Sequence, residues 1–177
     1  HLIFTLGPLA DTPFYGSSRF AVFTKSPQTG IYSESYSGGK ITHSFSRTGY
    51  DAIIIEGRSQ RPIFLEISDE EVLFHSASPL WGKETYEAEE ALLKRIGKKG
   101  AGAMVIGPAG ENLVKFAVIE IERWRSLGRA GIGAVMGSKK LKGIVFHGKK
   151  RREVADLSSL KRLAKDFKDR VKDNPTV

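Results

Sequence analysis

The sequence contains no cysteine among its 177 residues. Because iron–sulfur clusters are held chiefly by cysteine thiolates, this chain lacks their usual ligands. It also has no apolar run near the roughly 20 residues that a membrane-spanning helix needs, so no membrane partner is expected. The chain opens on His1, inside a strand-like apolar run, and we expect it to be a piece of a longer protein. Its hydrophobic content of 40% and charged content of 27% are ordinary for a globular domain with a buried core.

The net charge of +8 is unevenly distributed. Residues 149–177 carry 10 Lys and Arg against 5 Asp and Glu, whereas residues 1–148 carry 18 against 15. A short basic run of this kind is typical of a solvated linker. Aromatic residues do not alternate with the basic ones, as they do on many nucleic-acid-binding surfaces, so the pattern disfavours a nucleic-acid partner. The charge therefore divides the chain into one domain, 1–148, and a basic linker with a helix, 149–177.

Hydrophobic periodicity predicts an α+β fold with more strand than helix. Short apolar runs bounded by Gly, Pro, Asp or Ser predict strands at 2–6, 20–24, 52–56, 63–67, 72–75, 103–106, 113–121 and 141–146. Helices are predicted at 39–47, 83–96 and 133–138. A fourth helix follows Asp156, a predicted N-cap, and carries an apolar stripe that includes Leu160 and Phe167. Because so short a helix is marginal alone in water, we expect its stripe to pack on another domain.

A sequence pattern that occurs twice, which we call the Phe-Ala-Val echo, predicts two related β-sheet halves. Gly7-Pro8 precedes a Phe-Ala-Val triplet at 20–22, and Gly107-Pro108 precedes the same triplet at 116–118. In both halves arginine and glycine then occur before the last strand. Duplicated halves would present two similar ligand sites.

The second of these loops has the composition of a phosphate-binding site. It contains Arg125, Gly128 and Arg129, followed by Gly131, Gly133 and Gly137. Glycine lets backbone amides approach a ligand closely, and the planar guanidinium of arginine matches phosphate oxygens. From the residues alone, surface charge remains an alternative for the two arginines. A stand-alone module that binds a phosphate-bearing ligand without catalysis also stays open.

The segment GPAGENLVKFAVIEIERWRSLGR at 107–129 resembles the N-terminal domain of the aldehyde ferredoxin oxidoreductases, which are tungsten or molybdenum bis-pterin enzymes. The blocks GPLADTPFYGSSRFAVFTKSPQTG, YSGGKITHSFSRTGYDAIIIEG and ASPLWGKETYEAE extend the resemblance over residues 2–148. It implies a base of two β halves, each contacting one pterin. It further implies oxidation of an aldehyde to a carboxylic acid in the cytoplasm, with electrons passing to ferredoxin through an iron–sulfur cluster in later domains. Those C-terminal domains are expected partners, and a homodimer is an open one.

By resemblance, seven residues contact the cofactor: Arg19, Tyr36, Gly38, Arg125, Ser126, Gly128 and Arg129. In the family, the positions of Tyr36 and Ser126 offer main-chain carbonyls to a magnesium ion that bridges the pterin phosphates. Asparagine is common at the first position and alanine at the second. Since a carbonyl ligand does not depend on its side chain, the two replacements are compatible with a magnesium site, although they do not preserve a side-chain contact. The amides at 37–39 are expected to open a helix whose N-terminus favours an anion.

Other polar residues have no such support. His43 and His75 lack partners at metal-binding spacing, and His147 is expected at the surface. Asp11 and the pair Ser17-Ser18 show no arrangement of nucleophile and base in the sequence. The sequence identifies no catalytic proton donor.

Overall fold

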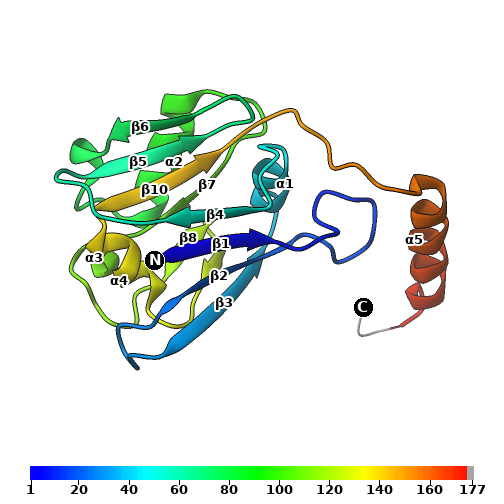
Figure 1. Ribbon diagram of the computed structural model, residues 1–177, viewed down its shortest axis with the longest axis horizontal. Coiled ribbons are helices and arrows are strands. Elements are labelled where there is room, and N and C mark those ends of the chain that lie inside the picture. The colour runs from blue at the N-terminus through cyan, green and yellow to red at the C-terminus, as the bar shows by residue number, and fades with distance from the viewer. Residues whose placement is uncertain (175–177) are drawn as a thin grey trace.

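Two β-sheets form the body of the protein in the computed structural model, which describes residues 1–174 (Figure 1). The first sheet is antiparallel, in the order β3-β2-β1-β4. Its strands are β1 (Leu2–Leu6), β2 (Arg19–Lys25), β3 (Tyr32–Gly38) and β4 (Ala52–Ile55). The second sheet has the order β6-β5-β10-β7-β8-β9, and its only parallel pair among these residues is β10 with β5. Its strands are β5 (Ile63–Ile67), β6 (Val72–Ser76), β7 (Gly102–Val105), β8 (Ile119–Ile121), β9 (Arg125–Leu127) and β10 (Leu141–Phe146). The predicted α+β class with two sheets is confirmed.

One hydrophobic core joins the sheets. Leu2 and Phe4 of the first sheet belong to the same buried cluster as Phe146 of the second. Phe45, on helix α1 (Ile41–Ser46), stacks on Phe146 with ring centroids 4.7 Å apart. Every residue of β10 is buried, as expected for a central strand covered on both faces. The two sheets therefore fold as a single unit.

The remaining helices cover the second sheet or extend from the body. Helix α2 (Thr85–Ile96) buries Ala88 and Leu92 against a second apolar cluster. It ends at Gly97 in the left-handed conformation, a common helix terminator. The short helices α3 (Pro108–Glu111) and α4 (Ile132–Ser138) pack against each other, and a 3₁₀ turn, η1 (Ser78–Leu80), precedes α2. No helix within residues 1–174 combines the length and the hydrophobicity needed to cross a bilayer.

The predicted strand at 113–121 is wrong over most of its length, because only Ile119–Ile121 is extended. Pro108 starts α3 at a position where its missing N–H costs nothing, and the left-handed Leu113 (φ 59°) follows that helix. Phe116 is consequently 72% exposed and belongs to no strand. The Phe-Ala-Val echo thus lies in β2 in the first half but in a loop in the second. Strands β3 and β9 were not predicted from the sequence.

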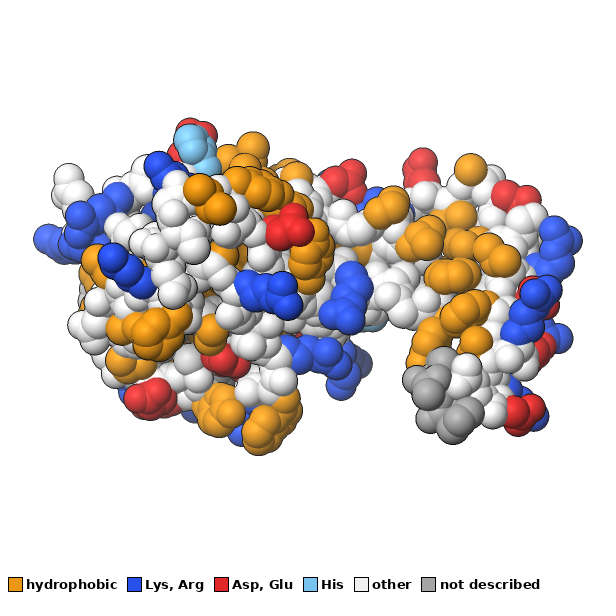
Figure 2. All heavy atoms as spheres, turned by 90° about the horizontal axis from the view of Figure 1, so that it is seen from below, with side chains coloured by type: hydrophobic (Ala, Val, Ile, Leu, Met, Phe, Trp, Pro, Cys, Tyr) orange, Lys and Arg blue, Asp and Glu red, His pale blue; other side chains and the backbone are white. Residues whose placement is uncertain are grey.

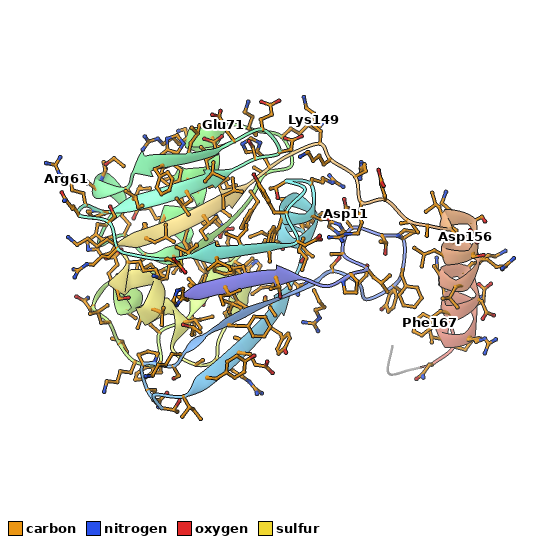
Figure 3. The ribbon with its side chains drawn as sticks, viewed as in Figure 1. Asp11, Arg61, Glu71, Lys149, Asp156 and Phe167 are labelled. Carbon is orange, nitrogen blue, oxygen red and sulfur yellow. The ribbon has the colours of Figure 1, made fainter. Side chains whose placement is uncertain are left out.

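Helix α5 (Leu157–Val171) stands apart from the sheets (Figure 1). The predicted N-cap is confirmed, because the Asp156 carboxylate accepts a hydrogen bond from Ser159 N at 2.8 Å and this bond lowers the Asp156 pKa to about 2. No residue of α5 is buried. Its apolar side faces the body (Figures 2 and 3), where Phe167 meets the rings of Phe14 and Tyr15 at 5.7 and 5.9 Å. The stripe is therefore only partly covered.

A buried ion pair ties β10 to two other segments. Lys142 is fully buried, donates to Lys83 O at 2.8 Å and pairs with Glu111 of α3. The second carboxylate oxygen of Glu111 accepts from Gly82 N at 2.7 Å. Burial lowers the pKa of the Lys142 ammonium, and Glu111 partly offsets this. Both charges are satisfied only while α3 and the turn before α2 stay in place.

Breaking this pair from one side should destabilise the fold strongly. Glu111→Gln leaves the buried ammonium without a counter-charge, so we expect a loss of about 3 kcal/mol in the free energy of unfolding. Lys142→Met should cost a similar amount, and the double variant should lose less than the sum of the two. Denaturant unfolding of all four proteins measures this coupling. Strictly additive losses would contradict it.

Candidate cofactor-binding site

The outer edges of the two sheets meet, and this contact brings the predicted site residues together. Strand β3 ends one sheet, β9 ends the other, and the two strands are in contact. A hydrogen bond from Arg129 N to Ser35 Oγ, 3.2 Å long, crosses between them. We call residues 32–41 and 122–129 the sheet junction. All seven predicted positions lie on it or beside it: Tyr36 and Gly38 on β3, Arg125 and Ser126 on β9, Gly128 and Arg129 after β9, and Arg19 on β2 opposite Gly38.

Two consecutive glycines allow the close approach. A Cβ atom on Gly38 would lie 2.3 Å from Ser18 O and 3.3 Å from Arg19 Cδ. Gly39 has φ +110°, and a Cβ there would lie 2.8 Å from Arg125 Cδ. The stems of two candidate arginines thus lie against neighbouring glycines, one from each half of the chain. At Gly128 a Cβ would make only ordinary contacts, so the fold itself does not require glycine there.

The arginines of the junction have free hydrogen-bonding capacity. Within residues 1–174, the exposed side chains of Arg19 and Arg129 make no hydrogen bond or ion pair. Arg125 is 53% exposed, and its Nε lies 3.9 Å from Glu122 Oε2. A cavity of about 630 Å³ opens beside Arg125, with Lys40 and Trp124 in its wall. Of the three arginines only Arg125 lines this cavity, which Glu89 and Glu122 line as well. Exposed guanidinium groups with free donors are suited to bind phosphate oxygens through charge-assisted hydrogen bonds.

The first amide of helix α1 is paired within the protein. The helix begins at Ile41 rather than at the predicted residue 39, and Ile41 N donates to Glu122 Oε1 at 2.5 Å. This carboxylate lies 81 residues away in the sequence, so local sequence could not reveal the contact. Anion binding by the amides at 37–39 stays a prediction.

Tyr36 and Ser126 are both exposed. Each lies on a strand whose outer side has no strand partner in the described part of the chain. No group of three or more His, Asp or Glu side chains in residues 1–174 is placed to bind a metal ion. The magnesium role of the two main-chain carbonyls remains a prediction.

The structure also groups polar residues that looked unrelated in the sequence. Asp11 accepts from His43 Nδ1 at 2.8 Å and from Arg47 Nε at 3.1 Å, while Ser18 Oγ lies 3.1 Å from His43 Nε2. Arg151 of the linker lies 3.6 Å from Asp11 as well. The sequence showed no arrangement of nucleophile and base at Asp11 and Ser18, whereas the structure brings both residues against His43.

The order of these contacts is that of a Ser–His–Asp triad. Asp11 is shared with two arginines, however, which indicates a clamp that holds the loop before Arg19 against α1 and the linker. Figure 3 shows Asp11 at the point where this loop leaves the body. No spacing rule could have found the cluster, because its members come from three separate segments.

Two more histidines, His75 and His147, share a structural partner far from the junction. His75 Nε2 and His147 Nε2 each lie 2.7 Å from a carboxylate oxygen of Glu66. This bridge links β6 and the end of β10 through β5. Burial would raise the pKa of Glu66, but the hydrogen bonds from both histidines outweigh it, and the pKa is lowered.

The geometry defines a two-sheet α+β domain with exposed arginines at the junction of its sheets, and sequence comparison identifies its family. The family described as "Aldehyde ferredoxin oxidoreductase, N-terminal domain" matches residues 1–148. The chain therefore belongs to the aldehyde ferredoxin oxidoreductase family and contains its N-terminal domain.

Individual relatives agree with this assignment. The tungsten-containing aldehyde ferredoxin oxidoreductase of Thermococcus kodakarensis is 44% identical over 176 residues, which are 99% of this chain and 29% of the relative. The WOR-like subunit of an aliphatic sulfonate oxidoreductase from Pyrococcus furiosus is 31% identical over 179 residues, covering 94% and 28%. Among solved structures, the active-site complex BamBC of benzoyl coenzyme A reductase with 1,5-dienoyl-CoA superposes with a TM-score of 0.93. It is 39% identical and covers 98% of this chain and 27% of that one. The chain thus spans less than a third of these relatives.

The Asp11 clamp predicts a specific pH dependence of stability. Burial alone would raise the pKa of Asp11, but hydrogen bonds from Arg47 and His43 outweigh it and lower the pKa below the ordinary value of 3.8. The stabilisation is therefore fully present above about pH 4 and is lost as the pH falls through the folded-state pKa.

Asp11→Asn should cost about 2 kcal/mol at neutral pH, since it removes charge-assisted hydrogen bonds while asparagine tolerates the left-handed backbone (φ 57°). The difference from the unmodified protein should shrink near pH 3 in denaturant unfolding. Asp169→Asn, an exposed carboxylate on α5, is the matched control. A difference of the same size at both pH values would contradict the clamp.

Proposed function

We propose that residues 1–148 form the cofactor-binding base of a tungsten-containing aldehyde ferredoxin oxidoreductase. The whole polypeptide oxidises an aldehyde to a carboxylic acid and passes the electrons to ferredoxin. One observation carries this proposal. The stems of Arg19 and Arg125 lie against the glycine pair Gly38–Gly39, and the Arg129 amide bonds to Ser35 of the same strand, so three exposed arginines lie at the junction of the two sheets. The names of four relatives, 40–44% identical to this chain, support the reaction.

The residues present fit a bis-pterin group. Arg19, Arg125 and Arg129 would hold its phosphates, and the carbonyls of Tyr36 and Ser126 would hold magnesium between them. When bound, the tungsten and its dithiolene sulfurs supply the two-electron redox chemistry, and the protein supplies position and electrostatics. Tungsten is favoured over molybdenum by the names of the relatives.

Other parts of the polypeptide must complete the enzyme. This chain has no cysteine, so the thiolates of an iron–sulfur cluster would come from the remaining length that the relatives possess. The family match ends at residue 148, which supports a domain boundary there and a linker with α5 at 149–177. We place the protein in the cytoplasm, with its C-terminal domains and ferredoxin as partners and with a homodimer as its assembly. The relatives are named as oxidoreductases and are much longer than this chain, which matches only 29% of the first of them. This favours a part of an enzyme over a stand-alone binding module and over a nucleic-acid-binding protein.

The junction arginines should control cofactor retention. In the full-length polypeptide, Arg125→Ala or Arg129→Ala removes charge-assisted hydrogen bonds of about 1.5–3 kcal/mol each. Bound tungsten and pterin should therefore fall together while the circular dichroism spectrum is unchanged. Arg129→Lys should restore only part of the content, because an ammonium cannot reproduce the planar fork.

Arg61→Ala is the matched control, because Arg61 is also exposed but lies at the far end of the second sheet (Figure 3). Metal and pterin per folded protein are the quantities to measure. Full content in the Arg125→Ala/Arg129→Ala double variant would remove the physical basis of the proposal.

The incompletely covered stripe of α5 should pack on the remainder of the polypeptide. In the 177-residue chain we expect the amides of α5 to exchange with solvent much faster than those of β10, because no α5 residue is buried. In the full-length polypeptide the α5 amides should become protected. Hydrogen exchange read residue by residue tests both expectations. Protection equal to that of β10 in a monomer of this chain would contradict them.

A further inference from the structure

The turn that leads into β9 has an unfavourable backbone conformation. Glu122 (φ 50°) and Arg123 (φ 61°) both adopt the left-handed region, which costs non-glycine residues about 1–2 kcal/mol each. Neither residue is glycine, asparagine or aspartate, the types that enter this region readily. Something in the surrounding structure must therefore hold the turn.

A buried glutamate of α2 supplies that support. Glu89 is only 5% exposed, and its two carboxylate oxygens accept hydrogen bonds from Glu122 N at 3.0 Å and Arg123 N at 3.1 Å. Burial raises the pKa of Glu89, and these two amides partly offset the increase. A buried carboxylate is tolerated when both of its oxygens have donors. Glu89 thus holds the backbone turn from which the Glu122 side chain extends.

The Glu122 side chain points across the junction to the first half of the chain. Its Oε1 accepts from Ile41 N at 2.5 Å, and its Oε2 lies 3.9 Å from Arg125 Nε. The same Oε2 would lie 2.5 Å from a Cβ on Gly39. One carboxylate therefore contacts the start of α1, the second junction glycine and a candidate cofactor arginine.

We propose that Glu122, oriented by Glu89, is a positioning residue that sets the spacing between the two halves of the cofactor site. It holds Arg125 and the backbone at 39–41 in fixed relation. This inference rests on the proposed function for the identity of the ligand, but the hydrogen bonds that carry it are present without one.

The charge of Glu122 distinguishes positioning from electrostatics. A carboxylate beside Arg125 lowers the local positive potential, which opposes the binding of a phosphate-bearing ligand. Its hydrogen bond to Ile41 N has the opposite effect, because it keeps the binding groups in place. Substitutions can change the charge and the length of the Glu122 side chain separately. If Glu122 acts by positioning, cofactor retention should depend on the length of this side chain and not on its charge.

Three substitutions in the full-length polypeptide separate the two effects. Glu122→Ala removes the contact, so tungsten and pterin should be lost on dialysis about tenfold faster. Glu122→Asp keeps the charge and tolerates the left-handed backbone, but it shortens the side chain by one methylene, and it should fail similarly. Glu122→Gln keeps both the length and an acceptor oxygen, and it should retain the cofactor as well as the unmodified protein or better.

The matched control is Glu90→Ala, which removes an exposed glutamate of α2 whose side chain, within residues 1–174, pairs only with the exposed Arg123 at 3.2 Å. It should retain the cofactor fully. Normal retention in Glu122→Asp, or loss in Glu122→Gln equal to that in Glu122→Ala, would overturn the positioning role. Circular dichroism identifies any variant that fails to fold, and the Asp and Gln variants then decide the result.

Hydrogen exchange at Ile41 separates this inference from the proposed function. The Ile41 amide should exchange about tenfold faster in Glu122→Ala and in Glu122→Asp, with or without cofactor, and at the normal rate in Glu122→Gln. If the unmodified polypeptide contains no tungsten or pterin, the proposed function fails, and Ile41 exchange alone then decides whether Glu122 holds the junction. Unchanged exchange in Glu122→Ala would show that it does not.

Discussion

The contact between the free edges of the two sheets is the feature on which the candidate site depends. Either sheet alone would present only part of a cationic surface. Gly38 and Gly39 lie at the end of strand β3, and Arg125 lies on β9. The hydrogen bond from Arg129 N to Ser35 Oγ connects the two strands. The shared core beneath, with Phe45 stacked on Phe146, keeps the sheets from sliding. Folding of the two sheets and assembly of the site are therefore one event.

Apolar patterning predicted the buried part of the fold. Strand β1 is almost continuously hydrophobic, strand β10 is apolar except at Lys142 and Gly143, and helix α2 carries an apolar face and ends at glycine. Strand β3 has the sequence YSESYSG, in which polar residues occupy an edge with no strand neighbour on one side, so burial left no signal to read. The helix at Pro108–Glu111 was missed because a Gly-Pro-Ala-Gly sequence suits a turn equally well.

The site was predictable only in part, for a related physical reason. The chemical properties of arginine and glycine can be read directly from a sequence, and the structure places the predicted residues on or beside one junction. The carboxylates that support them do not show their role in this way. Glu89 and Glu122 act on backbone amides that are distant in the chain, and a glutamate on a helix or in a turn is ordinarily solvated. Hydrogen bonds to backbone amides leave no residue pattern, so only three-dimensional structure reveals them.

The crowding around Gly38 and Gly39 has an evolutionary consequence. Any side chain at these positions would collide with the backbone of Ser18 or with the side chains of Glu122 and Arg125, so substitution there threatens the fold as well as the site. The exposed arginine heads face no such barrier. The fold therefore fixes the glycine pair, whereas the chemistry of the exposed surface around it can change without disturbing the backbone beneath.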